Sequence, residues 1–247
     1  MKILVCISKT PDTTAKIAFT DNNTKFDVNG VQWIINPNDE FYALVRAIEL
    51  KEADTSTVLH LINVGGADSD AILRKAFAIG GDEGIRVNSE NPDSFHVASQ
   101  IATVAKEGNY DLVFLGKETI DYNSSSVGGM VAELLNLPYI SLATRFELSG
   151  TLATITREIE GGEEICEVSL PVVVSCNKGM AEQRIPNMRG IMAARTKPLK
   201  VIDPVATDTL TEIVQFSLPP EKAGVKLVAP DNIAELVRLL HEEAKVL

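Results

Sequence analysis

Four short apolar runs alternate with amphipathic segments over the first half of the chain. The runs predict buried strands over residues 2–8, 58–64, 84–87 and 110–115. Between the runs, apolar residues recur at spacings of three and four, which predicts helices with one buried face. These helices carry Phe41, Leu44, Val45 and Ile48; Ile72, Leu73, Ala76 and Phe77; and Val97, Ile101 and Val104. Strands that alternate with helices in this way predict a parallel sheet covered on both faces.

A long polar stretch, residues 116–129, follows the fourth run. It leads into a helix with a predicted buried face of Met130, Val131, Leu134 and Leu135. In α/β proteins a phosphate binds where a strand ends and the next helix begins, because the N–H groups of the first turn face that crevice. The serines at 124–126 offer hydroxyl donors or helix caps. The stretch is therefore a candidate nucleotide-binding loop.

The pattern changes after residue 138. Residues 139–170 hold three alternating runs separated by glycine-containing turns at 149–150 and 160–162, which predicts antiparallel hairpins. Residues 171–176 predict a return to a buried strand. A last amphipathic helix, with Asp231 as its expected N-cap, ends the chain.

Together these elements define an α/β fold class. We expect a parallel twisted sheet flanked by helices, Rossmann-like and nucleotide-binding, with an antiparallel hairpin insert and an extended C-terminal arm. Leu218-Pro219-Pro220 marks a boundary between the body and the arm. We expect the nucleotide-binding domain over residues 1–218 and the arm with its helix over residues 219–247.

Composition narrows the possible partners and location. The 247 residues are 45% hydrophobic and 23% charged, with a mean hydropathy of +0.08. No apolar run approaches the ~20 residues of a membrane helix, and the first residues lack the zones of a signal peptide. We therefore expect no membrane insertion and a cytoplasmic location. The net charge of −11 disfavours nucleic acid and anionic membranes as partners.

The residue types that carry catalysis lack the arrangement that catalysis requires. No P-loop or G-x-G-x-x-G motif is present, and no serine lies in a nucleophile elbow. The three histidines have no metal-ligand spacing, and we expect His96 and His241 on helix surfaces. The cysteines, Cys6, Cys166 and Cys176, lie in apolar runs typical of core positions rather than of a disulfide or metal site. The pattern favours a nucleotide-binding protein with no catalytic residue and no metal.

The local charge reverses over residues 178–200. This segment holds six basic residues and one acid, Glu182, together with three of the five methionines, Met180, Met188 and Met192. In an acidic chain, a basic segment with adaptable methionines fits a surface that meets several acidic partners. A solvated loop with methionines tucked into the core fits equally well.

Residues 155–166, followed by 170–174, resemble the signature of the beta subunit of electron transfer flavoproteins. Cys166 stands where this family usually carries Leu, Ile or Val, which is a mild departure because cysteine is small and apolar. Supporting stretches occur in family order along essentially the whole chain: residues 5–9, 36–39, 116–121, 184–194 and 223–226.

The resemblance implies a heterodimer with an alpha subunit, which supplies most of the binding for a redox-active FAD. It also implies that this chain buries a structural AMP through mostly backbone contacts. Family members hold AMP at positions that match Cys6, Asn36, Pro37, Asn38, Asp39, Val64, Gly116, Lys117, Glu118, Thr119, Ile120, Asp121, Tyr122, Asn123, Ser124, Ser125, Ser126 and Val127. Glu158 matches a residue that helps to orient the flavin domain.

The basic segment matches the family's recognition loop, which docks on acyl-CoA dehydrogenases. The implied recognition residues are Arg184, Met188, Arg189, Ile191, Met192 and Arg195, with Met188 in place of an anchoring leucine. Electrons would pass from the dehydrogenases to the FAD and on to electron transfer flavoprotein–quinone oxidoreductase. The C-terminal arm would contact the alpha subunit.

Three alternatives stay open. Electron-bifurcating members carry a second FAD in place of AMP and tend to show Asp-Gly-Asp-Thr after the Ile-Asp of the loop. Here Tyr122-Asn123-Ser124 follows Asp121, and this favours AMP. A universal-stress-like ATP-binding domain usually has a second loop glycine where Thr119 stands. An ATP pyrophosphatase requires a Ser-Gly-Gly-x-Asp-Ser loop after the first strand, which residues 8–12 lack.

Overall fold

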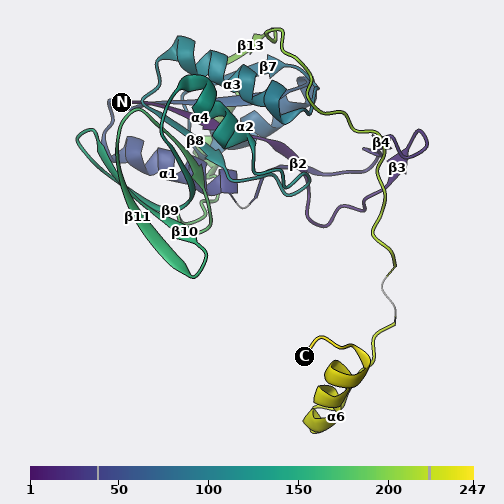
Figure 1. Ribbon diagram of the computed structural model, residues 1–247. Coiled ribbons are helices and arrows are strands. Elements are labelled where there is room, and N and C mark those ends of the chain that lie inside the picture. The colour runs from purple at the N-terminus through teal and green to yellow at the C-terminus, as the bar shows by residue number, and fades with distance from the viewer. Residues whose placement is uncertain (38, 222–223) are drawn as a thin grey trace.

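A nine-stranded sheet forms the centre of the molecule. The computed structural model (Figure 1) describes residues 1–37, 39–221 and 224–247. The strands lie in the order β11-β10-β9-β12-β8-β1-β6-β7-β13. Their bounds are β1 Lys2–Cys6, β6 Val58–Gly65, β7 Glu83–Asn88, β8 Leu112–Gly116, β9 Tyr139–Ser149, β10 Leu152–Ile159, β11 Gly162–Ser169, β12 Val172–Cys176 and β13 Leu199–Ile202. In the spatial order of the sheet, the strands β9, β12, β8, β1, β6, β7 and β13 are all parallel to their neighbours in that row, which confirms the predicted α/β class.

Helices cover both faces of the sheet, as the apolar spacing predicts. Two separate cores result, because successive strand residues point to opposite faces. Helices α1 (Asp39–Ala53) and α2 (Asp70–Ile79) pack on one face, and α3 (Ser94–Gly108) and α4 (Val127–Leu135) pack on the other. The first core includes Leu44, Phe77 and Phe114, and the second includes Ile101 and Val131.

The predicted hairpin insert forms β9, β10 and β11, which extend from one edge of the sheet (Figure 1). Gly150 and Gly161 occupy the two turns at φ +61° and +82°, where a side chain would be strained. Two small antiparallel sheets accompany the body. One pairs β2 (Lys9–Pro11) with β5 (Trp33–Ile35), and the other pairs β3 (Phe19–Thr20) with β4 (Lys25–Phe26).

The chain after β13 runs without regular structure from Asp203 to Asn232, in its described part, and ends in α6 (Ile233–Arg238) and a short π-helical turn, Leu239–Glu243. Figure 1 shows this last segment well away from the body. The N-cap is Asn232, whose side chain accepts from the Glu235 N–H, so the prediction of Asp231 was wrong by one residue. Asn38 and Ala223, both expected in family-like stretches, lie outside the described residues.

Two burial predictions were also wrong. Leu134 is 41% exposed because α4 packs through Gly128, Val131 and Ala132 instead. His96 is buried rather than on a helix surface. Within the described residues, no helix combines the length and apolar character needed to cross a bilayer.

Candidate functional site

The predicted nucleotide-binding residues gather at the carboxyl ends of three neighbouring strands. Cys6 ends β1, Val64 lies near the end of β6, and Gly116 ends β8, with β1 between the other two in the sheet. Asn36 and Asp39 lie beside this edge, at the start of α1. The carboxyl edge of a parallel sheet is where α/β proteins bind ligands. Asn38 lies outside the described residues.

Asn36 connects the start of α1 to the loop. Its side chain is fully buried. Its Nδ2 donates to the Glu118 carbonyl at 2.7 Å, and its Oδ1 accepts from the Ile120 N–H at 3.3 Å. One amide side chain therefore satisfies two backbone groups that lie more than 80 residues away in sequence. This contact fixes the path of the loop as it leaves β8 and explains why an asparagine stands before Pro37.

Gly116 lies against the first turn of α1. A Cβ at this position would lie 2.9 Å from the Asp39 Cβ, 2.9 Å from the Glu40 Cγ and 3.2 Å from the Glu40 backbone nitrogen. Such contacts are too short for any side chain, so only glycine lets β8 end this close to α1. The loop then crosses from the α1 side of the sheet to α4, which packs on the opposite face.

Two buried carboxyl groups lie where Gly116 meets α1. Burial raises the pKa of Asp39, and it raises the pKa of Glu40 to about 8. A carboxyl oxygen of Glu40 accepts a hydrogen bond from the Ser8 N–H just beyond β1. Glu40 therefore ties the end of β1 to α1, and sequence reasoning missed it. Its position directly after the 36–39 stretch is the signal that could have found it.

The middle of the loop is held by its own polar groups. Asn123 and Ser125 adopt positive φ values of +51° and +50°, and the Asn123 N–H donates to the Thr119 carbonyl at 2.9 Å. The Ser125 hydroxyl donates to the Glu118 carboxylate at 2.8 Å, and this hydrogen bond lowers the pKa of Glu118. Tyr122 is 54% exposed. Asp121, Ser124 and the other residues at the tip are also exposed.

The N-terminus of α4 has no side-chain cap. The Ser126 side chain makes no capping hydrogen bond, although its carbonyl accepts from the Met130 N–H. Gly128 is pressed against Tyr139, since a Cβ there would lie 2.7 Å from the phenol oxygen. The first turn of a nine-residue helix thus presents uncapped N–H groups and the positive end of the helix dipole. This arrangement suits a phosphate group.

Apolar groups flank this terminus. Cys6 belongs to the core under α3 and α4, and Val64 and Val127 pack against the same core. Burial raises the pKa of the Cys6 thiol, so the side chain is a neutral, unreactive core group. Cys6 and Cys176 are buried as predicted, while Cys166 is half-buried, and all three are free thiols. The described residues contain no cluster of His, Cys, Asp and Glu that could hold a metal ion.

One polar atom near this edge has no partner. Asn63, the residue before Val64, is buried in β6 and donates from Nδ2 to the Ile7 carbonyl at 2.8 Å. Its Oδ1 is buried and has no hydrogen-bond partner among the residues that the structure describes. An asparagine in the mostly apolar strand β6, which also holds His60, was a sequence signal that the prediction did not use.

Glu158 lies at the same edge of the sheet. Its carboxylate accepts from Nδ2 of Asn177 at 2.5 Å, and Asn177 directly follows β12. The Lys117 N–H, at the start of the loop, donates to the carbonyl of Cys176 at 3.3 Å. A short path of backbone therefore connects Glu158 with the loop. The structure brings these two predicted features together.

The predicted recognition segment forms a short helix, α5 (Met188–Ala194), that carries exposed apolar side chains. Met188 is 73% exposed, Met192 is 57% exposed and Ile191 is 38% exposed. Arg189 and Arg195 are exposed as well, but Arg184 pairs with Glu52 at 2.7 Å. Of the three predicted arginines, Arg184 is the one whose side chain forms an ion pair within the described part of the chain.

Contacts with α2 hold α5 in place. The Arg74 guanidinium donates to the carbonyls of Ala194 at 2.8 Å and Lys197 at 2.6 Å. At Gly190, a Cβ would lie 2.2 Å from the Ala78 carbonyl oxygen, so the two helices approach at backbone distance. The apolar side chains therefore project from a fixed support rather than from a free loop.

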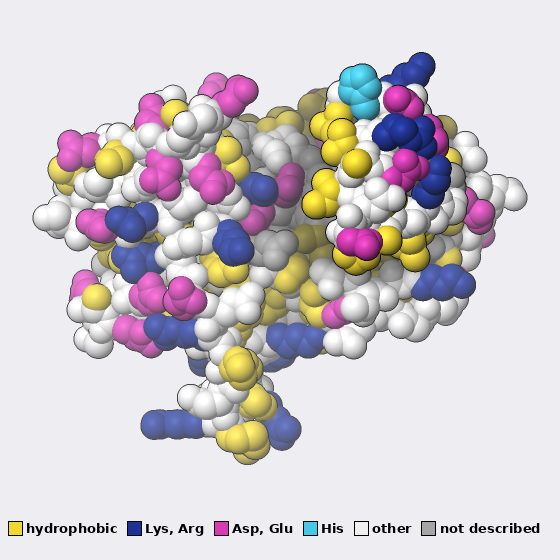
Figure 2. Space-filling model, turned by 90° about the horizontal axis from the view of Figure 1, so that it is seen from below, with side chains coloured by type: hydrophobic (Ala, Val, Ile, Leu, Met, Phe, Trp, Pro, Cys, Tyr) yellow, Lys and Arg dark blue, Asp and Glu magenta, His cyan; other side chains and the backbone are white. Residues whose placement is uncertain are grey.

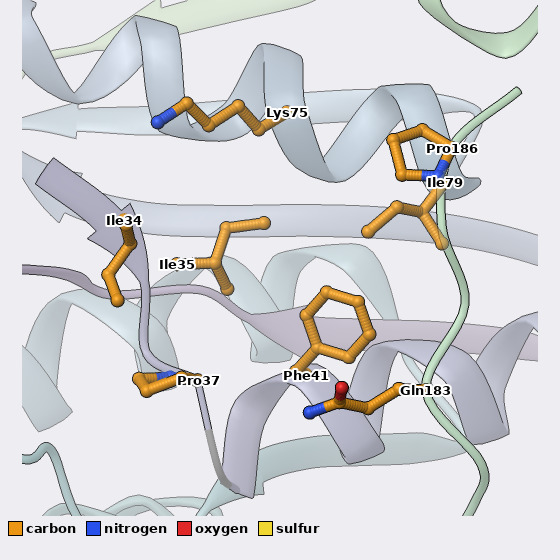
Figure 3. Close-up of a pocket in the computed structure, with 8 residues that line it drawn as sticks. All are labelled: Ile34, Ile35, Pro37, Phe41, Lys75, Ile79, Gln183 and Pro186. Carbon is orange, nitrogen blue, oxygen red and sulfur yellow. The ribbon is translucent and has the colours of Figure 1, made fainter. Parts of the chain in front are cut away.

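An apolar groove of about 340 Å³ lies beside this segment (Figure 3). Its walls come from β5, α1, α2 and the chain before α5, and the lining residues are Ile34, Ile35, Pro37, Phe41, Lys75, Ile79, Gln183 and Pro186. Pro37 thus lines this groove, on the α1 and α2 face. The recognition segment therefore carries exposed apolar side chains and also lies next to an apolar groove.

The fold and this edge define an α/β domain whose sheet is covered on both faces and whose carboxyl edge carries a helix terminus without a side-chain cap. Comparison with known proteins identifies the family. The model of the electron transfer flavoprotein domain matches residues 24–207. The chain belongs to the electron transfer flavoprotein family, as a member of its beta-subunit group.

Full-length relatives agree with this assignment. The chain is 39% identical to the electron transfer flavoprotein subunit beta of Syntrophomonas wolfei subsp. wolfei, covering 92% of this chain and 90% of that protein. It is 34% identical to the corresponding subunit of Bacillus subtilis over the whole of both chains. It is also 30% identical to the acryloyl-CoA reductase electron transfer subunit gamma of Anaerotignum propionicum, covering 94% of each chain.

Proposed function

We propose that this chain is the beta subunit of a heterodimeric electron transfer flavoprotein. Electrons pass from acyl-CoA and related dehydrogenases to an FAD bound mainly by the alpha subunit, and then to a quinone oxidoreductase. The family match over residues 24–207 and the full-length beta-subunit relatives support this role. The chain itself positions the flavin domain and recognises partners, without acid–base or covalent chemistry of its own.

We propose that the loop holds one AMP as a structural nucleotide. The observation that carries this proposal is the loop pinned by Asn36 that ends at the uncapped terminus of α4. The phosphate would accept hydrogen bonds from the first-turn N–H groups of α4. The apolar side chains of Cys6, Val64 and Val127 would border the nucleotide. Backbone donors suffice for this binding, so the site needs no reactive side chain.

The alternative is a second FAD at the same place, as in a bifurcating electron transfer flavoprotein. We retain this alternative because one relative is named as an acryloyl-CoA reductase electron transfer subunit rather than as an electron transfer flavoprotein subunit. The loop sequence after Asp121 favours AMP, because it lacks the Asp-Gly-Asp-Thr run. A universal-stress-like domain is disfavoured by the hairpin insert and the C-terminal arm.

The same proposal assigns roles to three further regions. Residues 1–218 form the nucleotide-binding domain, and residues 219–247 form an arm that contacts the alpha subunit. The exposed apolar side chains of α5, with Arg189 and Arg195 beside them, dock on the dehydrogenase. Glu158 faces the flavin domain of the alpha subunit.

Co-expression with the alpha subunit tests the proposed function. We expect a yellow heterodimer with a flavin absorption spectrum that bleaches when an acyl-CoA dehydrogenase and its substrate are added. The control omits the dehydrogenase and should keep its colour. A colourless complex, or a flavin that no dehydrogenase reduces, would contradict the proposal.

A further inference from the structure

Residues 203–218 lead from β13 to the proposed arm of residues 219–247, and the two together are called the arm from here on. The first part of this longer segment touches the body at two separate places. Residues 205–211 lie against the start of α3, and Phe216 lies against the hairpin formed by β3 and β4. In its described part, the arm forms no helix or strand between Asp203 and Phe216. The side chains that bind the arm therefore decide where the arm runs.

At the first contact, Asp93 binds the helix and the arm together. One carboxylate oxygen accepts from the His96 N–H at 2.8 Å, which caps α3. The other oxygen accepts from Thr211 twice, from its N–H at 2.8 Å and from its hydroxyl at 2.6 Å. Asp93 is only 3% exposed, so these bonds are shielded from water. Charge-assisted bonds of this kind are among the stronger ones in proteins.

Two more α3 side chains extend this first contact. Gln100 bonds Val205 reciprocally, donating to its carbonyl at 2.9 Å and accepting from its N–H at 2.8 Å. The buried ring of His96 has one nitrogen 2.6 Å from the Thr207 hydroxyl and the other 2.8 Å from the Ser89 hydroxyl. Three points along the arm, at residues 205, 207 and 211, thus have partners on α3 or at its N-cap.

The second contact combines an aromatic stack with a backbone bond. The ring of Phe216 stacks on that of Phe19 with centroids 5.0 Å apart and an interplanar angle of 9°. The Phe216 N–H donates to the Asn23 carbonyl at 2.7 Å. The hairpin of β3 and β4, which has no other role in the site, therefore holds the arm just before it leaves the body.

Beyond this point the arm presents apolar groups to solvent. Val225 and Leu227 are each 91% exposed, Ile233 is 68% exposed and Val237 is 51% exposed. In Figure 2, which views the molecule from below, the C-terminal segment lies nearest the viewer, with hydrophobic side chains on one side and charged side chains on the other. The apolar face of such an amphipathic segment is shielded from water only when a partner covers it.

We propose that the two contacts form a tether that pre-orients residues 224–247 for docking on the alpha subunit. Asp93, His96, Gln100 and Phe19 are then positioning residues for assembly, although they do not touch the partner. The physical reason is that ordering a flexible segment opposes binding, and a tethered segment has lost part of that freedom beforehand. The identity of the partner rests on the proposed function, whereas the tether itself does not.

Substitutions on the arm test the tether without disturbing the caps of the body. Thr207→Val, Thr211→Val and Phe216→Ala are combined in the full-length chain, with Val214→Ala as the matched control because Val214 is 79% exposed between the contacts. We expect amide exchange over residues 205–216 to accelerate in the triple variant. We also expect its affinity for the alpha subunit to fall by about tenfold or more. The control should match the parent in both measurements.

The outcomes separate the tether from the proposed function. Unchanged exchange in the triple variant would show that these contacts do not hold the arm. Faster exchange with undiminished affinity would show that holding the arm does not aid assembly. Either result overturns the inference. If the parent chain does not bind the alpha subunit, the proposed function fails, and the exchange measurement still decides whether the two contacts hold the arm.

Discussion

Asn36, Gly116 and Glu40 set the geometry at the carboxyl edge of the sheet. Asn36 pins the loop, Gly116 allows β8 to end against α1, and Glu40 ties that helix to the end of β1. Asn36 and Gly116 were predicted as site residues from the family resemblance, but their physical roles were not. Those roles depend on contacts between residues that lie far apart in sequence, so no local sequence pattern could predict them.

Gly116→Ala tests the close approach of β8 and α1. The added Cβ would fall within 3.2 Å of the Glu40 backbone nitrogen, which cannot move without shifting the helix. We expect the free energy of unfolding to fall by about 1–3 kcal/mol, as for other overpacked sites. Denaturant unfolding measures this change. Gly162→Ala is the control, because no described atom outside its own chain neighbours lies within 4 Å of its Cβ position. Equal stability of the two variants would refute the packing argument.

Glu40→Gln tests the buried carboxyl group. Because burial raises the pKa of Glu40 to about 8, the native state binds one proton more than the unfolded state between about pH 4.5 and pH 8. The free energy of unfolding therefore falls as the pH rises through this window, by up to about 1.4 kcal/mol per pH unit. The Gln variant lacks this contribution. Unfolding curves at pH 5.5 and 7.5 should show it gaining stability relative to the parent, and parallel curves would contradict the prediction.

At the scale of elements, periodicity predicted which helices form and most of their buried faces. The face of α2 was predicted correctly because Ile72, Leu73, Ala76 and Phe77 all pack in one core. The face of α4 was partly wrong, since glycine can be the residue that packs closest and a hydrophobicity pattern gives it no weight. His96 was missed because its partner Thr207 lies 111 residues away. Contacts between residues so far apart in the chain produce no local pattern in the sequence.

The element with the most direct functional prediction is α5. Met188→Glu places a charge on the exposed apolar face that we propose docks on dehydrogenases. We expect the rate of flavin reduction by an acyl-CoA dehydrogenase to fall about tenfold or more, with flavin content unchanged. Stopped-flow absorbance of the heterodimer measures the rate. Leu134→Glu, at an exposed apolar position on α4, serves as the control. Equal rates for both variants would place the anchor elsewhere.

At the scale of the whole molecule, a sheet with two covered faces supports the three surfaces to which we assign different roles. The carboxyl edge carries the loop and Glu158, the α2 side carries α5, and the arm leaves past α3 and the small hairpin (Figure 1). The α/β class and the hairpin insert followed from the sequence pattern. The path of the arm did not, because it depends on polar contacts between residues about 105 to 118 positions apart.

The nucleotide content of the purified heterodimer tests the account most directly. Nucleotides are released by denaturation and identified by mass, with their amounts measured against protein. We expect one AMP and one FAD per heterodimer, with the AMP lost when Asn36→Ala removes the hydrogen bonds that hold the loop. Two FAD and no AMP, or no nucleotide besides a single FAD, would contradict it.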